Sequence, residues 1–198
     1  MRKGLVIFLH GVGSNGDDLA GLGEHWAPLL QGVSFAAPDA PFHFEHGAGF
    51  QWFSLQAITE QNRPGRVLAA REAFDQQLRA LLQAHSVTED RVILVGFSQG
   101  SIMALDALAS GRWQFAGVVA FSGRLATSAL SPCTNTPALI VHGQDDDVIP
   151  WMESEAAALR LKGAGVHVET QFEPATGHTI SGQGARRAAT FIAQCLHD

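Results

Sequence analysis

The chain has 198 residues, a formal net charge of −6, 46% hydrophobic residues and 16% charged residues. This is the composition of a folded globular protein and excludes a disordered chain. The basic residues are scattered and form no cluster that could follow a phosphate backbone, so nucleic acid is not an expected partner.

No apolar segment approaches the roughly 18–20 residues that a membrane helix needs, so stable membrane insertion is not expected. At the N-terminus, Arg2 and Lys3 precede only six apolar or small residues before His10. That apolar core is too short for a signal peptide, and we therefore expect a cytoplasmic protein. Because single domains run to about 250 residues, residues 1–198 are expected to form one domain.

Short apolar runs alternate with helical patterns along the chain. Runs that are apolar on both faces predict central strands of a parallel sheet, whereas the alternating run 166–172 predicts a half-exposed strand near an edge. In chain order the predicted elements are strand 4–11, helix 17–30, strand 33–37, a long helix beginning near Pro64, strand 91–97, helix 101–109, strand 115–121, strand 138–142, helix 153–161, strand 166–172 and helix 184–196. This order predicts an α/β fold with a mostly parallel central sheet and helices on both faces.

Two features depart from these regular patterns. In the long helix, Arg71 is the only polar member of the stripe that faces the core. The segment 38–63 is rich in proline, glycine, histidine and aromatic residues, and a connection of this length is usually functional. Its aromatic side chains either line a pocket or cap the core, and for Phe42 and Phe44 both interpretations stay open. Whether residues 42–54 form a rigid wall or a moving lid also stays open.

The sequence Gly96-Phe97-Ser98-Gln99-Gly100 fits the pattern G-x-S-x-G. It follows the strongest predicted strand and opens a buried helix, which is the context in which this pattern marks a nucleophilic serine. So sharp a turn forces the serine into a strained backbone conformation and needs small flanking residues. The hydroxyl then stands at the carboxyl end of the sheet, where open α/β folds bind ligands. We therefore predict Ser98 as a nucleophile, the alternative being a tight turn with an inert serine.

A serine hydroxyl needs a base to take its proton, and histidine suits that task near neutral pH. In folds with this serine turn, the acid and then the histidine follow the serine along the chain. His142 ends a strand before a good acid has appeared, His167 lies on the alternating strand, and His197 is one residue from the chain end. His178 lies in the loop between the last predicted strand and the last predicted helix, where it can reach Ser98. We predict His178 as the general base.

An acid that orients this histidine is expected at the carboxyl end of strand 138–142. Three adjacent aspartates follow that strand, namely Asp145, Asp146 and Asp147. Chemistry alone does not choose between them. Adjacent negative charges repel, so at least two should be solvated or cap the helix that starts near Trp151.

The oxyanion of a tetrahedral intermediate needs two N–H donors. One is expected from Gln99, directly after the nucleophile, and the other from the loop after the first strand. That loop reads His10-Gly11-Val12-Gly13-Ser14, and its glycines let the backbone approach a ligand closely. We assign the second donor to Val12. The loop lacks the glycine spacing of nucleotide-binding motifs, so phosphate binding is the weaker interpretation.

Taken together, the motifs resemble the phospholipase/carboxylesterase family of α/β hydrolases, which includes acyl-protein thioesterases. The resemblance covers nearly the whole chain. The residues that carry it are Leu9-His10-Gly11-Val12-Gly13, Pro38-Asp39-Ala40-Pro41, Trp52-Phe53, Gly96-Phe97-Ser98-Gln99-Gly100, His142-Gly143 with Asp146 and Val148-Ile149-Pro150, and Gly177-His178. The resemblance implies a compact single-domain α/β-hydrolase fold. It also implies that Asp146 is the acid and that Val12 and Gln99 supply the oxyanion donors.

For the substrate, the resemblance implies that Trp52, Phe53 and Ile149 border the acyl pocket. Ser54 stands where family members often have an aspartate, and residues 42–50 differ from the long apolar loop of the eukaryotic thioesterases. The resemblance is therefore closer to bacterial-type carboxylesterases, which act on short to medium acyl chains.

These observations predict a serine hydrolase that cleaves carboxylic esters through an acyl-enzyme intermediate. One alternative is an acyl thioesterase or lysophospholipase that uses the same three residues. Another is a protein that binds a small ligand on a hydrolase scaffold. The expected partner is a small-molecule ester or thioester, and a homodimer is a further possibility. No organic cofactor is implied. No metal is expected either, because His43 and His46 lie in a loop and no two histidines stand at a ligand spacing on a helix.

Overall fold

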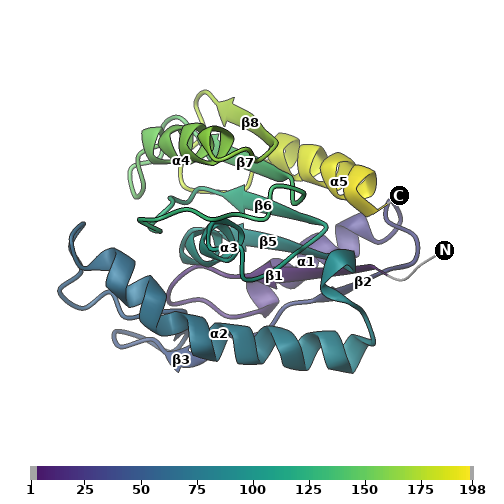
Figure 1. The fold of residues 1–198 in the computed structure, drawn as a ribbon, viewed down its shortest axis with the longest axis horizontal. Coiled ribbons are helices and arrows are strands. Elements are labelled where there is room, and N and C mark those ends of the chain that lie inside the picture. Colours follow the sequence, from purple (N-terminus) through teal and green to yellow (C-terminus); the bar gives the residue numbers. More distant parts are fainter. Residues whose placement is uncertain (1–3, 197–198) are drawn as a thin grey trace.

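The computed structural model describes residues 4–196, whose largest sheet has six parallel strands in the order β2-β1-β5-β6-β7-β8 (Figure 1). The strands of this sheet are β1 Gly4–Leu9, β2 Val33–Ala36, β5 Val92–Phe97, β6 Gly117–Phe121, β7 Ala138–Gly143 and β8 Val168–Glu173. The α-helices are α1 Asp17–Trp26, α2 Arg63–His85, α3 Gln99–Ala109, α4 Met152–Gly163 and α5 Gly182–Leu196, and a 3₁₀ turn spans Glu89–Arg91.

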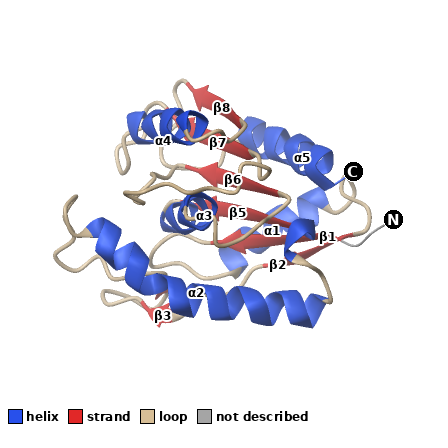
Figure 2. Cartoon of the chain, viewed as in Figure 1, coloured by secondary structure: helices blue, strands red, loops and turns tan. Residues whose placement is uncertain are grey.

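Helices cover both faces of the sheet, as Figure 2 shows. Leu5, Ile7 and Leu9 of β1 pack on the face that α2, α3 and α4 cover. Val6 and Phe8, which alternate with them, pack on the face that α1 and α5 cover. All residues of β1 are buried, and this explains why its sequence is a continuous apolar run. The predicted α/β architecture is confirmed.

Each predicted strand is present, and the predicted elements differ from the observed ones only at their ends. Strand β8 is at the edge of the sheet and half-exposed, as its alternation predicts. Helix α1 ends at Trp26 instead of near Leu30, and the chain continues in turns whose N–H groups at Leu29 and Leu30 still bond to the Trp26 carbonyl. Helix α3 starts earlier than predicted, directly after Ser98.

The segment 38–63 contains a small antiparallel hairpin, β3 Phe42–His43 and β4 Phe50–Gln51. The hairpin braces the loop after β1, because Gly13 N–H donates to the Phe50 carbonyl at 2.8 Å and Phe50 N–H donates to the Ser14 carbonyl at 2.8 Å. Beyond it, Trp52 and Phe53 are buried in the core on the α2 side of the sheet. Phe53 also borders a hollow that Phe42 and Arg66 line with it. Phe42, in contrast, is exposed.

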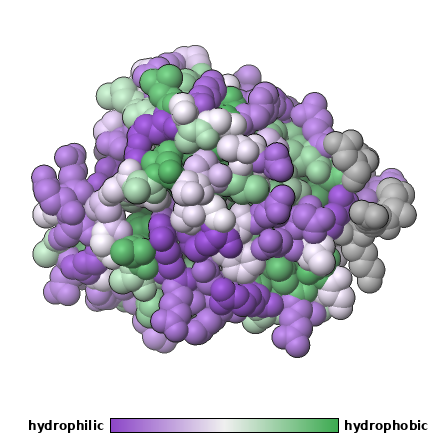
Figure 3. All heavy atoms as spheres, viewed as in Figure 1, coloured by the Kyte–Doolittle hydropathy of each residue, from purple (hydrophilic) through white to green (hydrophobic). Residues whose placement is uncertain are grey.

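The surface of the described residues bears on two kinds of partner, a membrane and a second copy of the chain. No helix within residues 4–196 is both long and apolar enough to cross a membrane. On the face drawn in Figure 3, hydrophilic residues cover most of the surface and apolar residues form small separate groups. The homodimer remains a prediction.

The polar member of the α2 stripe has a partner in α3. Arg71 donates to both carboxylate oxygens of Asp106 at 2.9 and 2.8 Å. Asp106 also accepts hydrogen bonds from Arg112 at 2.8 Å and from Thr127 at 2.7 Å, and its side chain is fully buried. Burial would raise the pKa of Asp106, but the hydrogen bonds from Arg71 and Thr127 and the two guanidinium charges hold it below its ordinary value. The network ties α2 to α3, the helix that begins at Ser98.

We expect Asp106→Asn to lower the free energy of unfolding by about 3 kcal/mol, because it leaves Arg71 with a neutral partner at a buried site and removes one of the two carboxylates that bind Arg112, which keeps Asp75. The pKa of Asp106 is lower in the folded protein than in the unfolded protein. The carboxylate therefore stabilises the fold above about pH 4, and this contribution is lost as the pH falls through the folded-state pKa. Urea unfolding followed by tryptophan fluorescence measures both effects. Asp90→Asn, at an exposed aspartate, is the control. Equal stability of Asp106→Asn and wild type at pH 7 would contradict the expectation.

Candidate active site

The turn between β5 and α3 has the strained geometry that the G-x-S-x-G pattern predicts. Ser98 lies between the last residue of β5 and the first of α3, with φ 54° and ψ −114°. A Cβ on Gly96 would lie 2.5 Å from the Gly100 carbonyl oxygen, and one on Gly100 would lie 2.0 Å from the Leu9 carbonyl oxygen. Only glycine fits at either position, so β5, α3 and β1 can approach closely. The turn presents the Ser98 hydroxyl at the carboxyl ends of the strands.

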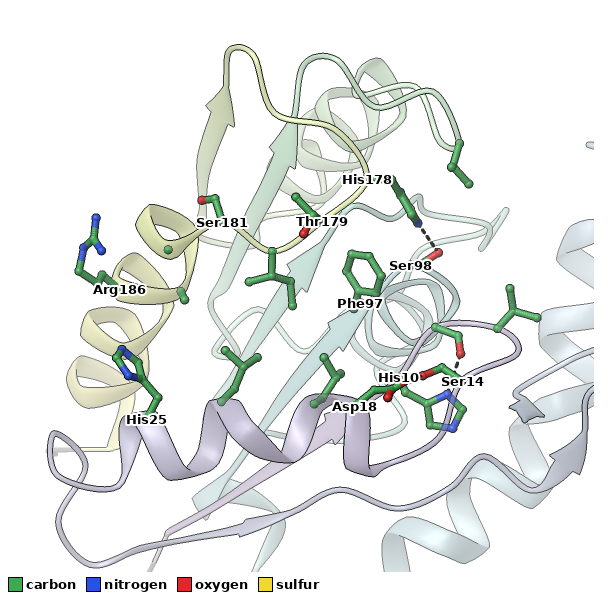
Figure 4. A pocket seen from close by; sticks show the side chains of 18 residues that line it. His10, Ser14, Asp18, His25, Phe97, Ser98, His178, Thr179, Ser181 and Arg186 are labelled. Carbon is green, nitrogen blue, oxygen red and sulfur yellow. Dashed lines mark hydrogen bonds between the residues drawn. The ribbon is translucent and has the colours of Figure 1, made fainter. Parts of the chain in front are cut away.

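His178 reaches this hydroxyl from the loop between β8 and α5. Its Nε2 lies 3.0 Å from Ser98 Oγ. Figure 4 marks this contact with a dashed line. Its ring packs against that of Phe97, with 4.9 Å between the centroids. The loop is joined to the end of β7, since Asp145 N–H donates to the Thr176 carbonyl at 2.9 Å. The strand order therefore brings residues 80 positions apart in the chain into hydrogen-bonding contact.

Of the three adjacent aspartates, Asp146 contacts the histidine. Its Oδ2 lies 2.6 Å from His178 Nδ1, and its Oδ1 accepts the N–H groups of Val148 at 2.8 Å and Ile149 at 2.9 Å. Asp145 and Asp147 are exposed, which agrees with the expectation that two of the three are solvated. Neither caps α4, whose N-cap residue is Trp151 with no side-chain cap hydrogen bond. With Nδ1–H donating to Asp146, Nε2 of His178 is free to accept the Ser98 proton.

Burial would raise the pKa of Asp146, but hydrogen bonds from His178 and from the N–H groups of Ile149 and Val148 outweigh it and hold the pKa below its ordinary value. The group is therefore a carboxylate at neutral pH, which is the form that can stabilise a positive charge on His178. A second imidazole, that of His142, also contacts Asp146 Oδ2, at 2.9 Å.

The loop after β1 passes beside the nucleophile. A Cβ on Gly11 would lie 3.4 Å from the Cβ of Ser98. Val12 is in the turn that follows, and Gln99 is the first residue of α3, where backbone N–H groups lack partners within the helix. Both N–H groups lie on segments next to Ser98, which supports their assignment as oxyanion donors.

Trp52, Phe53 and Ile149, predicted to border the acyl pocket, do not line the groove beside Ser98. The Gln99 side chain accepts the Trp52 N–H at 2.7 Å and donates to the Phe53 carbonyl at 2.7 Å. The Trp52 indole donates to the His10 carbonyl at 2.8 Å. The backbone of Trp52 and Phe53 therefore holds the side chain of Gln99, the residue after Ser98, and both aromatic side chains are buried. Ile149 is also buried, and its N–H bonds to Asp146.

The groove that contains Ser98 runs between α1 and α5 and has a volume of about 820 Å³ (Figure 4). Ser98 and His178 lie at one end, and His25 and Arg186 lie at the other. Its apolar walls come from Leu19, Leu22, Phe97, Val148, Ile180 and Ala185. Sequence reasoning missed these residues. The spacing of Leu19 and Leu22, on one face of the predicted helix 17–30, was the available signal, but it does not show which neighbour that face meets.

Known proteins are similar to this chain in sequence and in architecture. The profile of the family described as Phospholipase/Carboxylesterase matches residues 1–196. The esterase YpfH of Escherichia coli is 33% identical over 184 residues, which are 93% of this chain and 79% of the relative. The chain belongs to the phospholipase/carboxylesterase family. It is an enzyme of the α/β-hydrolase fold that acts on carboxylic esters.

Two further family relatives bear on the substrate. The crystal structure of the esterase PE8 has a TM-score of 0.88 to this chain at 32% identity and covers 98% of this chain and 94% of its own. An acyl-protein thioesterase 1 of Gibberella zeae is 27% identical over 96% of this chain and 90% of its own length. Relatives of this chain therefore include both esterases and an acyl-protein thioesterase.

Proposed function

We propose that this phospholipase/carboxylesterase family member hydrolyses carboxylic esters of short to medium acyl chain through an acyl-enzyme on Ser98. The observation that carries the proposal is the continuous contact from Ser98 Oγ to His178, at 3.0 Å, and from His178 to Asp146, at 2.6 Å, beside an apolar groove. Nucleophile, base and orienting acid are thus in reach of one another and of a site where an ester can bind.

In the acylation step, Ser98 Oγ attacks the ester carbonyl carbon while His178 Nε2 takes the hydroxyl proton. The carbonyl oxygen becomes an oxyanion, which the N–H groups of Val12 and Gln99 stabilise. The intermediate collapses, the bond to the alcohol oxygen breaks, and His178 gives its proton to that oxygen. The acyl group remains as an ester on Ser98, and the alcohol leaves.

In the deacylation step, a water molecule gives a proton to His178 Nε2 and attacks the acyl carbonyl carbon. A second oxyanion forms at the same N–H groups. When it collapses, Ser98 Oγ leaves and recovers the proton from His178, so the products are the alcohol and the carboxylic acid. Asp146 keeps its negative charge in both steps and stabilises the imidazolium at His178.

The chain-length preference is tested with p-nitrophenyl esters from acetate to palmitate, and with thioesters of the same acids under thiol detection. We expect the highest kcat/KM at short to medium chains and faster turnover of esters than of thioesters. Turnover of thioesters alone would make the protein a thioesterase, and turnover of neither would leave a ligand-binding scaffold. Both outcomes would overturn the proposal.

Filling the groove should change this preference. Leu22 lines the groove from α1 and is half-buried. In Leu22→Trp we expect kcat/KM for p-nitrophenyl octanoate to fall about tenfold or more, because a few lost methylene contacts are worth that factor. The acetate ester is too short to reach the indole and should keep its rate. Leu29→Trp, at a side chain that is 61% exposed and outside the groove, is the control. An equal loss on both esters would contradict acyl binding between α1 and α5.

A further inference from the structure

His142, the last residue but one of β7, is a buried titratable group that the steps above do not use. Its side chain is 0% exposed. Its Nε2 lies 2.9 Å from Asp146 Oδ2 and 2.9 Å from the Ile149 carbonyl oxygen. Its Nδ1 lies 2.7 Å from the Oγ of Ser154, in the first turn of α4. The ring thus joins β7, the loop that carries the acid, and α4.

These contacts determine where the ring carries its proton. The Asp146 carboxylate oxygen and the Ile149 carbonyl oxygen can only accept, so Nε2 of His142 must be the donor. Burial lowers the pKa of His142 more strongly than its bonds to Ile149 and Asp146 raise it. The ring is therefore neutral at pH 7, so Nδ1 is an acceptor. The Ser154 hydroxyl lies 2.7 Å from Nδ1 and 3.2 Å from the Gly123 carbonyl oxygen, and its one proton goes to the shorter contact, with Nδ1.

We propose that His142 is a positioning residue, which as a neutral donor holds Asp146 Oδ2 in line with His178. Both imidazoles bond to the same oxygen, His178 Nδ1 at 2.6 Å and His142 Nε2 at 2.9 Å. A neutral donor fixes the direction of the carboxylate without cancelling the charge that stabilises the imidazolium at His178. The inference rests on the proposed function, because it assigns Asp146 the role of orienting acid.

Other charged groups near this site have partners or face the solvent. Glu153, beside Ser154 on α4, lies 3.7 Å from Arg124. Glu173, at the end of β8, accepts hydrogen bonds from Gln171 and Ser181. Asp145 and Asp147 on the acid loop are exposed. Among the residues that the structure describes, the hydrogen bonds to Asp146 Oδ2 come from His142 and His178.

Two amide substitutions separate the contacts of His142. In His142→Asn the shorter amide can replace Nδ1 toward Ser154 but stops short of Asp146. In His142→Gln the longer amide can reach the position of Nε2 and donate to Asp146. A carboxylate that loses a donor becomes more basic and stabilises the imidazolium of His178 more strongly. We therefore expect the asparagine variant to raise the midpoint of the pH-dependent rise in kcat/KM by about half to one pH unit.

The same variant should lower kcat about tenfold and leave KM within about twofold, because the carboxylate is no longer held in the direction the transition state needs. The glutamine variant should return both kcat and the pH midpoint toward the wild-type values. Ser154→Ala, which loosens the same buried cluster without removing the donor to Asp146, should keep the wild-type midpoint. A wild-type midpoint in His142→Asn would overturn the inference.

A second measurement needs neither a variant nor turnover. In wild-type protein labelled with ¹⁵N-histidine, NMR should show His142 as the neutral Nε2–H tautomer from about pH 7 to about pH 8. A cationic ring in this range, or the Nδ1–H tautomer, would overturn the inference. Failure of the proposed function would look different from failure of this inference. It would be shown by a wild type that does not hydrolyse esters, or by Ser98→Ala that hydrolyses them as the wild type does.

Discussion

Replacing Ser98 with alanine is expected to lower kcat for p-nitrophenyl acetate by about 10⁶-fold while the protein stays folded, a loss of the size seen when the nucleophile of a serine hydrolase is removed. The reason is that no acyl-enzyme can form without the Ser98 hydroxyl, so neither His178 nor the oxyanion donors have a covalent step to assist. The strained turn should tolerate alanine, whose Cβ occupies the position of the serine Cβ. Release of p-nitrophenol, followed at 25 °C with circular dichroism as the folding check, measures the effect.

A matched control is present one helical turn further on. Ser101 is a fully buried serine of α3 whose hydroxyl has no hydrogen-bond partner within the described residues. Ser101→Ala should keep kcat within about twofold, because it removes no bond and only a small volume. If Ser98→Ala kept more than about a thousandth of the activity, a different nucleophile or a directly activated water would have to be considered.

Asp146→Asn should lower kcat by about 10³- to 10⁴-fold, which is the second-largest effect we expect. An amide in place of the carboxylate can present its N–H₂ group to His178 and reverse the tautomer, so that Nε2 carries the proton and can no longer accept it from Ser98. The charge that stabilises the imidazolium is lost as well. Steady-state kinetics with the acetate ester at pH 7 to 8 give the size of the loss.

The substitution Asp145→Asn provides the control, because it removes the same negative charge one residue away. Its side chain is exposed and its backbone N–H, bonded to Thr176, is unaffected by the substitution. Asp145→Asn should therefore keep kcat within about twofold. The assignment of the acid would be contradicted if Asp145→Asn lost more activity than Asp146→Asn.

The parts of the fold that local sequence determines were predicted correctly. Strand β5, the turn at Ser98 and helix α3 could be recognised because an apolar run, two glycines and a buried helix each leave a local pattern. His178 followed from chain order and from its place in a loop after a strand. Arg71 stood out as an exception to the α2 stripe, but its partner Asp106 lies 35 residues away and no local pattern connects them.

The choice of acid shows where local reasoning stops. Three adjacent aspartates have the same chemistry, and only the family resemblance selected Asp146. The structure supplies a physical reason, since Oδ1 of Asp146 accepts two N–H groups from the turn at Val148 and Ile149 and this points Oδ2 at His178. His142 was considered only as a base, and its contact with Asp146 depends on how the 143–149 turn folds back on β7.

The substrate groove could not be predicted because it is a tertiary feature. Its walls come from α1, α5 and the loops at Ser98 and His178, and the sequence does not show that α1 and α5 lie on the same face of the sheet. The aromatic pair Trp52-Phe53 shows the same limit, since aromatic side chains suit a pocket and a core equally well. Both side chains are buried on the α2 side of the sheet, and Phe53 also lines a hollow beside Phe42.

The central claim is that the acyl group is transferred to Ser98, and trapping that intermediate tests it most directly. Wild-type protein is mixed with p-nitrophenyl octanoate, quenched in acid within the first turnovers and mapped by peptide mass spectrometry. The account predicts an added octanoyl group on the peptide that contains Ser98, and none on that peptide in Ser98→Ala. Two results would contradict this account. One is octanoate release by the wild type with the acyl group trapped on another residue, and the other is equal octanoate release by the wild type and Ser98→Ala.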